Sequence, residues 1–341
     1  MTTVCSLPRL ASVSLPFALA LAACSAREPA PSPEAHDPVG QASEPIQGGF
    51  DDGSDAAVVG LAVTDDNGHP MRSCTGTLIA PNLVLTAQHC VADTARYVDC
   101  RTSEFGALVE ASHVLVTPSE SMWAPGSQWF RAAEITTPPG QKKVCGNDLA
   151  LVRFDRPVAD AAAPISPGIG DDVEASEAYT AVGYGASGED LRDAGIRRRR
   201  NDLRVLCVGE ECSSTQVEPA EWRGDFGICD GDSGGPALDM KGRVIGVTSR
   251  GPSGCERPIY GKVTDHAEWL CSEAHLAASA GSYDLPKWAA LGDEGPTVVA
   301  PGGGGCSVSH DPGSGSFGLA ASMGLLALAT RRARSKNRSA I

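Results

Sequence analysis

Short apolar runs, separated by turns rich in Gly, Pro and Asp, fill most of the chain between residues 46 and 275. The run Thr77–Leu85 predicts two short β-strands that join at Pro81–Asn82. Residues Leu149–Phe154 predict another strand of the same kind. The pattern therefore predicts an all-β domain, and the stretch is long enough for two small barrels packed as one unit with a cleft between them.

Helical periodicity is confined to Asp265–Leu276, where Trp269 and Leu270 lie on the apolar side. Asp265 is a candidate N-cap, because its carboxylate can accept a hydrogen bond from a free backbone N–H of the first turn. The basic run Arg197–Arg200 predicts a solvated loop, with proteolytic nicking of that loop as an alternative.

The N-terminal end predicts export. Residues 1–23 resemble a lipoprotein-type signal peptide, because the apolar stretch Val13–Ala22 runs into Leu21-Ala22-Ala23-Cys24, which resembles a bacterial lipobox in which Cys24 is lipidated. A plain secretory signal peptide is the alternative, and both interpretations export the protein. Residues 24–45 are rich in Pro, Ala, Ser and Glu, which predicts a disordered tether or propeptide.

The C-terminal end adds a second location signal. After a predicted linker at residues 276–305, the segment 306–341 combines Cys306, the apolar stretch Phe317–Thr330 and a basic tail. This combination resembles the C-terminal sorting tag of myxobacterial surface proteins, in which the cysteine is the processing site. A simple tail anchor is the alternative, although the apolar stretch is shorter than the roughly 20 residues that span a bilayer. We expect a protein that is secreted or associated with the cell surface or outer membrane.

Charge and cysteine content narrow the class of protein. The formal net charge of −14 argues against nucleic acid as a partner. The chain has 12 cysteines, which in an exported protein predict disulfides. No Cys and His spacing typical of a metal site is apparent in the sequence, so we expect neither a metal nor a cofactor.

The most informative segment is Gly227–Pro236, which holds Ser233 in a glycine-rich turn. A serine hydroxyl is a weak nucleophile until a base takes its proton, and acyl transfer also needs donors for the oxyanion. Because Gly231 has no Cβ, its N–H and that of Ser233 can converge on one carbonyl oxygen. The segment predicts a nucleophile beside an oxyanion hole, with a plain Gly-rich turn as the alternative.

A base and a group that orients it occur in matching contexts. His89 follows the second strand of the Thr77–Leu85 pair, and Asp148 stands at the entrance of the Leu149–Phe154 strand. A carboxylate there could accept the second ring N–H of the histidine, which fixes the imidazole tautomer. Each residue alone has a structural explanation, as a core histidine or a turn aspartate, but the two together with Ser233 favour catalysis.

These three segments resemble the trypsin/chymotrypsin-type serine proteases, peptidase family S1, whose triad runs His, Asp, Ser along the chain. The resemblance covers residues 46–275, with a departure at Gln88, where the family has alanine. It implies two packed six-stranded antiparallel β-barrels with a short C-terminal helix. It also implies that Ser233 attacks the scissile carbonyl, that His89 acts as general base and then acid, and that Asp148 orients the imidazole.

The resemblance extends to activation. The segment Ile46-Gln47-Gly48-Gly49 resembles the N-terminus of the mature family enzymes, with Gln47 where valine is usual. Cleavage after Pro45 by an unknown protease would release an ammonium on Ile46, which in the family inserts beside the residue before the nucleophile, here Asp232. We therefore expect a zymogen, although Pro45 replaces the usual Arg or Lys.

The family also implies two disulfides. Cys74 with Cys90 would pin the histidine loop, and Cys229 with Cys255 would brace the substrate pocket. Other pairings stay open at this point: Cys100 with Cys145 and Cys207 with Cys212 are plausible by proximity or elimination, and Cys271 has no obvious partner.

The substrate pocket differs from that of trypsin in the residue at its base. In the family this position lies six residues before the nucleophile, and here it is Gly227. The base of the pocket therefore has no carboxylate that could pair with an Arg or Lys side chain of the substrate. The resemblance places Ile228, Ser249 and Gly251 around the same pocket, with Arg250 replacing a common aromatic. We expect a small or medium apolar residue before the cleaved bond, while Asp230 could attract a cation at the rim.

The predicted function is that of an exported serine endopeptidase acting on proteins or peptides. The alternative is a catalytically silent relative that uses the same surface as a binding module. The complete set of His89, Asp148, Ser233, Gly231 and Asp232 favours the enzyme, because a binding module needs none of them.

Overall fold

The computed structural model describes residues 39–40, 49–158, 162–186, 193–228, 230–252 and 257–290. The chain divides after Pro38 into two compact units, and all of the described residues belong to the second unit. No helix among them is both long and apolar enough to cross a membrane. The predicted signal peptide with Cys24, the activation site at Ile46 and the C-terminal segment with Cys306 lie outside the described residues.

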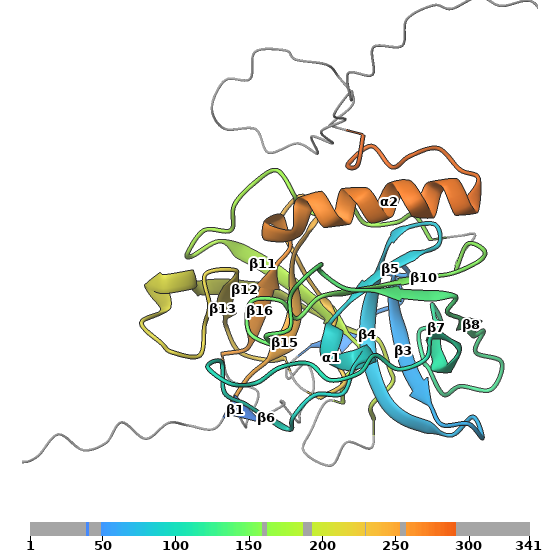
Figure 1. The fold of residues 1–341 in the computed structure, drawn as a ribbon, viewed down its shortest axis with the longest axis horizontal. Helices are drawn as coiled ribbons and strands as arrows, with labels where there is room; N and C mark the ends of the chain where they lie inside the picture. The colour runs from blue at the N-terminus through green and yellow to red at the C-terminus, as the bar shows by residue number, and fades with distance from the viewer. Residues whose placement is uncertain are drawn as a thin grey trace, which may run out of the picture. The chain divides into compact units, whose positions relative to one another are not determined.

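The N-terminal half of this unit is one antiparallel sheet in the order β8-β7-β3-β4-β5-β10-β9 (Figure 1). Its strands are β3 (Val58–Thr64), β4 (Pro70–Ala80), β5 (Leu83–Thr86), β7 (Val114–Thr117), β8 (Phe130–Arg131), β9 (Glu134–Thr136) and β10 (Ala150–Arg153). The predicted strand pair is confirmed, since β4 and β5 join at Pro81–Asn82. Asn82 is buried in this turn, and its side-chain amide donates to the carbonyl oxygen of Phe154 at 3.0 Å.

The C-terminal half is a closed barrel. Its sheet runs β11-β14-β15-β16-β13-β12-β2, and an extra β11–β12 pairing closes six of these strands into a ring. The strands are β2 (Phe50–Asp51), β11 (Ala178–Gly183), β12 (Arg198–Val208), β13 (Glu221–Gly224), β14 (Pro236–Leu238), β15 (Val244–Arg250) and β16 (Ile259–Lys262). The predicted fold class is confirmed: the protein is all-β and chymotrypsin-like. The closed barrel faces a half-barrel formed by the first sheet.

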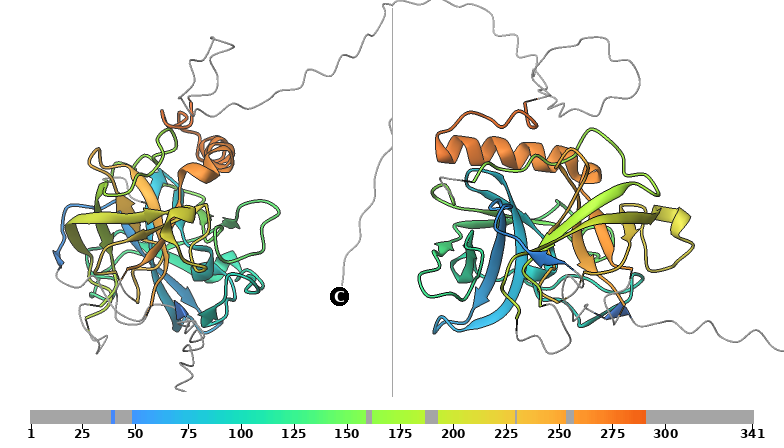
Figure 2. Two further views of the ribbon diagram at one scale, coloured as in Figure 1. Left: turned by 90° about the vertical axis from the view of Figure 1, so that its left-hand side faces the viewer. Right: turned by 180° about the vertical axis from the view of Figure 1, so that it is seen from behind.

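The remaining elements are short, apart from one helix. They are β1 (Val39–Gly40) and β6 (Tyr97–Val98), which pair with each other, the helices α1 (Gln88–Val91) and α2 (Ala267–Gly281), and the 3-10 helices η1 (Ala111–His113), η2 (Gly209–Cys212) and η3 (Thr264–His266). Seen from behind, α2 lies along one side of the two sheets (Figure 2).

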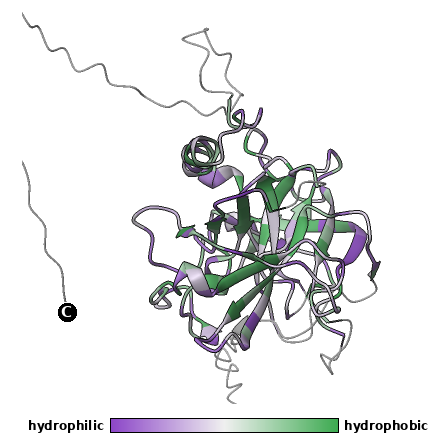
Figure 3. Cartoon of the chain, turned by 90° about the vertical axis from the view of Figure 1, so that its right-hand side faces the viewer, coloured by the Kyte–Doolittle hydropathy of each residue, from purple (hydrophilic) through white to green (hydrophobic). Residues whose placement is uncertain are grey.

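Apolar side chains fill the interior, as the strand pattern predicted. Figure 3 shows mainly hydrophobic strands inside and hydrophilic loops around them. At the centre of the closed barrel, Trp222 stacks on Tyr260 with ring centroids 4.1 Å apart, and Tyr179 meets both edge-on. Such aromatic contacts contribute about 0.5–1.5 kcal/mol each beyond their buried area. They make the second barrel a rigid support for the loops at its rim.

Helix α2 begins and ends later in the chain than predicted. It begins at Ala267 and ends at Gly281, while Asp265 lies in η3 and forms an ion pair with Lys262 at 3.1 Å instead of capping the helix. Residues 276–290, predicted as linker, contain the last turn of α2 and Trp288, whose indole N–H donates to the carbonyl oxygen of Ile79 at 3.0 Å. Packing against the first sheet stabilises helix beyond the point where its own periodicity ends.

The basic run Arg197–Arg200 is a second correction. Instead of a solvated loop, it enters strand β12, and Arg197 and Arg198 are only 2% and 6% exposed. Arg197 pairs with the buried Asp52 at 3.5 Å and donates to the Tyr184 hydroxyl at 3.0 Å. Charged side chains can line a strand in the interior when each finds such partners. The alternative of a cleavable loop also loses its basis.

Candidate active site

His89 and Asp148 meet because β5 and β10 are neighbouring antiparallel strands. Ala150 pairs with Thr86, so the helix α1 that follows β5 lies beside the loop that precedes β10. His89 Nδ1 lies 2.7 Å from Asp148 Oδ2, and the His89 backbone N–H donates to Asp148 Oδ1 at 2.9 Å. This two-point contact fixes both the position and the rotation of the imidazole.

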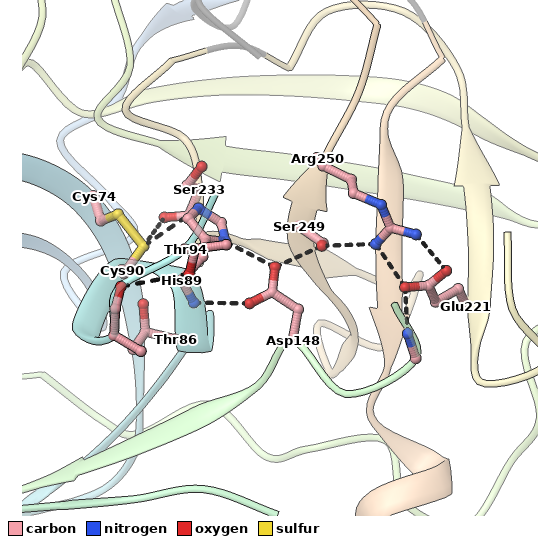
Figure 4. A network of polar contacts seen from close by, with 12 residues as sticks. Cys74, Thr86, His89, Cys90, Thr94, Asp148, Glu221, Ser233, Ser249 and Arg250 are labelled. Atoms are coloured by element: carbon pink, nitrogen blue, oxygen red, sulfur yellow. Dashed lines mark hydrogen bonds and ion pairs between the residues drawn. A yellow bond between two sulfur atoms is a disulfide. The ribbon is translucent and has the colours of Figure 1, made fainter. Parts of the chain in front are cut away.

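The Asp148 carboxylate is buried, being 1% exposed, and it receives a third hydrogen bond from the Ser249 hydroxyl at 2.6 Å (Figure 4). Burial by itself raises the pKa of this carboxyl, but the charge of His89 and the hydrogen bonds from His89 and Ser249 outweigh it, so the net pKa is lowered. Asp148 is therefore ionised and can only accept, so in a neutral imidazole the ring proton of His89 lies on Nδ1 and Nε2 is an acceptor.

The loop that carries Ser233 is tied to the first sheet through Thr75 of β4. The Thr75 hydroxyl donates to the carbonyl oxygen of Gly231 at 2.8 Å, and the Thr75 N–H donates to that of Ser233 at 2.8 Å. Gly234 has φ +81°, and a Cβ there would lie 2.1 Å from the Thr86 hydroxyl. Only glycine allows this approach, so the glycine-rich turn has a steric reason.

The directions of the Gly231 and Ser233 N–H groups follow from the contacts of the carbonyl groups in the same peptide units. The carbonyl of Asp232 accepts from the Gly235 N–H at 2.8 Å, inside the turn. The carbonyl oxygen of Asp230 faces Gly185, at 2.8 Å from the position of a Cβ on that glycine. Because N–H and C=O point in opposite directions across a trans peptide, the N–H groups of Ser233 and Gly231 point away from these two contacts.

His89, Gly231 and Ser233 line one cavity of about 260 Å³. Arg72 and Asp230 also line it. Arg72 is held by its Nη1, which donates to the carbonyl oxygens of His89, Cys90 and Ala92 at 2.7, 3.0 and 3.0 Å. Sequence reasoning missed Arg72 and Thr75, because nothing in the local pattern of β4 distinguishes them from ordinary strand residues.

Asp232 lies directly behind this loop and is 1% exposed. The Gly185 N–H donates to its Oδ1 at 2.8 Å. A Cβ on Gly183 or Gly185 would lie 2.2 or 2.6 Å from a carboxylate oxygen of Asp232, so the Gly-Tyr-Gly segment 183–185 leaves room for that side chain. The carboxylate is buried and closely enclosed, as a charge with a specific structural role would be.

The four residues expected around the substrate pocket have different surroundings in the structure. Ser249 is hydrogen-bonded to Asp148 as described, and Gly251, two residues further along the chain, is buried. Ile228 is 2% exposed and packs in the core of the second barrel. Gly227 has φ +113°, and Nη1 of Arg200 lies 2.2 Å from the position that its Cβ would occupy. A guanidinium therefore fills the space where a side chain at residue 227 would begin.

Arg250 does not take the place of a substrate-facing aromatic. Its side chain turns inward, is 3% exposed, and forms a fork with Glu221, with Nη1 2.6 Å from Oε1 and Nη2 2.8 Å from Oε2. Figure 4 shows the pair next to Ser249 and Asp148. Sequence reasoning missed Glu221 altogether, because a lone glutamate at the start of a strand gives no sign of burial.

Three disulfides join described cysteines: Cys74–Cys90, which the family resemblance implied, and Cys100–Cys145 and Cys207–Cys212, which were among the pairings left open. Cys271, which had no obvious partner, is also disulfide-bonded. Cys229 and Cys255 lie outside the described residues. Cys74 and Cys90 approach His89 to within metal-binding range, but sulfurs bonded to each other lack the thiolate charge that metals bind.

Known proteins have sequences similar to this chain. Residues 48–270 match the protein family described as Trypsin. The chain is 28% identical to renal glandular kallikrein of Mastomys natalensis over 58% of this chain and 78% of that protein. It is 27% identical to a trypsin of Saccharopolyspora erythraea, over 60% of this chain and 88% of that protein. Brachyurin of Leptuca pugilator is 28% identical over 60% and 89%.

The family match covers more than half of the chain, and it includes the segments that hold His89, Asp148 and Ser233. The fold of a closed β-barrel and a half-barrel agrees with it. The chain therefore belongs to the trypsin family and is a serine endopeptidase.

Proposed function

We propose that the protein is an exported endopeptidase that cleaves peptide bonds through His89, Asp148 and Ser233. The observation that carries this proposal is the two-point contact between Asp148 and His89, next to a cavity that His89 shares with Ser233 and Gly231. An imidazole held in one tautomer with Nε2 free to accept is the state that a general base needs.

In the proposed reaction, the Ser233 hydroxyl attacks the carbonyl carbon of the substrate, and its proton passes to Nε2 of His89. The N–H groups of Gly231 and Ser233 stabilise the oxyanion that forms, and Asp148 stabilises the imidazolium. His89 then gives the proton to the leaving amine, which leaves an acyl-enzyme on Ser233. Water, activated by His89, hydrolyses the ester by the same steps. Loss of one oxyanion donor typically costs about 100- to 1000-fold in rate.

Activation is proposed to follow the family pattern. Cleavage before Ile46 by another protease would release an ammonium that pairs with Asp232, and this pair would order the loop of Gly231 and Ser233. The burial of Asp232 beside Gly183 and Gly185 supports this role, because a buried carboxylate there gains from an ionic partner. We propose that the mature domain begins at Ile46, as expected, and that it extends past residue 275 to include all of α2 and Trp288.

The substrates are proposed to be proteins or peptides. Gly227 at the base of the proposed pocket offers no carboxylate, and the Arg200 guanidinium beside it adds a positive charge. A lysine or arginine before the cleaved bond is disfavoured there by like-charge repulsion in a poorly solvated site. Ile228, Ser249 and Gly251 form the remaining proposed walls.

The ends of the chain are proposed to set its location. A lipid on Cys24 or processing at Cys306 would hold the enzyme at the cell surface or outer membrane, and cleavage at both ends would secrete it. Three disulfides among the described residues support an oxidising compartment.

The first test is labelling of the exported protein with a fluorophosphonate, compared with Ser233→Ala, together with mass-spectrometric mapping of both termini. We expect a labelled chain that begins at Ile46 and no labelling of the variant. If a chain with that terminus stays unlabelled, the proposed catalysis is wrong and a catalytically silent binding module takes its place.

A further inference from the structure

The reaction proposed above does not use the buried ion pair between Arg250 and Glu221. Arg250 ends strand β15 and Glu221 begins β13, and the two side chains are 3% and 0% exposed. Their fork contacts are 2.6 and 2.8 Å long. Two apolar side chains could fill the same space without the cost of removing two charges from water, so stability alone is a weak reason for the pair.

One end of the pair reaches the Asp148 carboxylate through a single hydroxyl. Nη1 of Arg250 donates to Ser249 Oγ at 3.1 Å, and Ser249 Oγ donates to Asp148 Oδ2 at 2.6 Å (Figure 4). A guanidinium can only donate, so the Ser249 oxygen accepts on that side. Its one proton is thereby left for Asp148. Arg250 sets the direction of the hydrogen bond that Asp148 receives.

The other end holds the loop that carries Asp148. Glu221 Oε1 accepts from the Gly146 N–H at 2.6 Å, two residues before Asp148 in the chain, and Oε2 accepts from the Glu218 N–H at 2.9 Å. Nη2 of Arg250 also contacts Cys100 Sγ at 3.4 Å, in the disulfide with Cys145. The pair therefore restrains the Asp148 carboxylate in two ways: through the Ser249 hydroxyl, and through the Gly146 backbone in the loop that carries Asp148.

The charges of the pair matter as much as its contacts. The guanidinium of Arg250 interacts with the negative charges of Glu221, Asp148 and Glu218. Burial lowers the pKa of Arg223, and the positive charge of Arg250 adds to this effect. Burial lowers the pKa of Arg250, but the charge and hydrogen bonds of Glu221, together with the charges of Asp148 and Glu218, outweigh it, so the net pKa is raised. The negative charge of Glu221 thus compensates the positive charge of Arg250. Without Glu221, an uncompensated cation would face Asp148 and oppose a second positive charge on His89.

We propose that the Arg250–Glu221 pair is a positioning unit for Asp148: it directs the Ser249 proton, holds the Gly146 backbone and keeps the charge behind Asp148 neutral. The inference rests on the proposed function, because it assigns these residues to the same His89 and Asp148 chemistry.

The first test is Glu221→Gln, which keeps the shape and an accepting oxygen but removes the charge. The rate constant for fluorophosphonate labelling of the exported, processed protein is measured from about pH 5 to about pH 9. We expect a fall of about 10- to 100-fold at neutral pH. The acid limb of the profile should move to lower pH, because the uncompensated Arg250 disfavours protonated His89.

The second test removes both charges. The variant Glu221→Leu with Arg250→Met keeps an apolar interior and should fold, as such replacements commonly do. We expect slower labelling at all pH values. In a Ser249→Ala background the same double replacement should have a smaller effect than in the wild type, because part of its action passes through that hydroxyl. The matched control is Arg243→Met, directly before the start of β15, which should leave the rate unchanged.

The outcomes separate the two levels of the proposal. If the wild type is not labelled at all, the proposed function fails. If the wild type is labelled and the folded variants keep both its rate and its pH profile, the positioning role is wrong. If Glu221→Gln lowers the melting temperature but the folded double variant reacts like the wild type, the pair is purely structural and the inference is overturned.

Discussion

The Thr75 hydroxyl of the first sheet donates a hydrogen bond of 2.8 Å to the carbonyl oxygen of Gly231 in the loop before Ser233. The same oxygen, Thr75 Oγ1, accepts from the Tyr184 N–H at 3.0 Å. One fully buried side chain thus joins strand β4, the loop of Ser233 and the segment that encloses Asp232. The two sheets carry different parts of the site, and Thr75 fixes how those parts meet.

Replacement of Thr75 by valine should slow labelling of Ser233 by about tenfold or more, because the carbonyl of Gly231 loses its donor and the proposed oxyanion amides lose their anchor. The unfolding free energy should fall by about 1–3 kcal/mol, since buried polar groups are left unpaired. Labelling rates and thermal melts measure both effects. Thr180→Val, on the rim of the second barrel, is the control. Equal labelling rates in the two variants would contradict the anchoring role.

Acid should weaken the contribution of Asp148 to stability. Its pKa in the folded protein is lowered from 3.8, because the contacts with His89 and Ser249 outweigh burial. A lowered folded pKa gives stabilisation that is complete above the unfolded value and is lost as the pH falls toward the folded one. The melting temperature of wild type minus that of Asp148→Asn should therefore be positive at neutral pH and shrink below about pH 4. A difference that grows in acid would show that the sign is wrong.

The same substitution should abolish most activity. Asparagine at position 148 can donate to Nδ1 of His89, which favours the tautomer whose Nε2 carries the proton and cannot accept one. We expect a loss on the order of 10⁴-fold in turnover at neutral pH, with little change in substrate affinity. Steady-state kinetics on any cleaved peptide measures the split, and a loss confined to affinity would argue against Asp148 as the orienting group.

Arg200 should influence which residue precedes the cleaved bond. Its guanidinium lies against Gly227, so a peptide library should show arginine and lysine strongly disfavoured at that position, and glutamate cleaved faster than glutamine. Arg200→Met should remove the difference between glutamate and glutamine while leaving fluorophosphonate labelling unchanged. A wild-type preference for arginine would exclude this arrangement of the pocket.

Gly183→Ala should displace the Asp232 carboxylate, which lies behind the loop of Ser233. The new Cβ would lie 2.2 Å from Asp232 Oδ1, so the carboxylate must shift. Overpacking of this kind costs about 1–3 kcal/mol, and the displaced Asp232 should slow labelling of Ser233. Gly53→Ala is the matched control, because its Cβ would meet only Glu120 at 3.7 Å. If Gly183→Ala is labelled at the wild-type rate, the position of Asp232 does not control the loop.

Much of the site could be predicted from local sequence. His89 follows a strand, Asp148 precedes one, and Ser233 lies in a glycine-rich turn, and each signal depends only on neighbouring residues. The strand pair β4–β5 was predicted correctly for the same reason, because Pro81–Asn82 is a local turn signal between apolar runs. The resemblance to the protease family then supplied the barrel architecture, which the structure shows as a closed barrel and a half-barrel, and the disulfide at the histidine loop, which it contains.

The sequence by itself thus determined the all-β class and named the chemical groups of the candidate site, since both follow from patterns that span a few residues. Only the tertiary structure decided that Arg250 turns inward to Glu221, that Thr75 holds Gly231, and that Arg197 is buried with Asp52. The physical reason is that these contacts join residues far apart in the chain. A charged side chain in a strand looks exposed by its pattern, and its burial becomes possible only when folding brings an opposite charge to it.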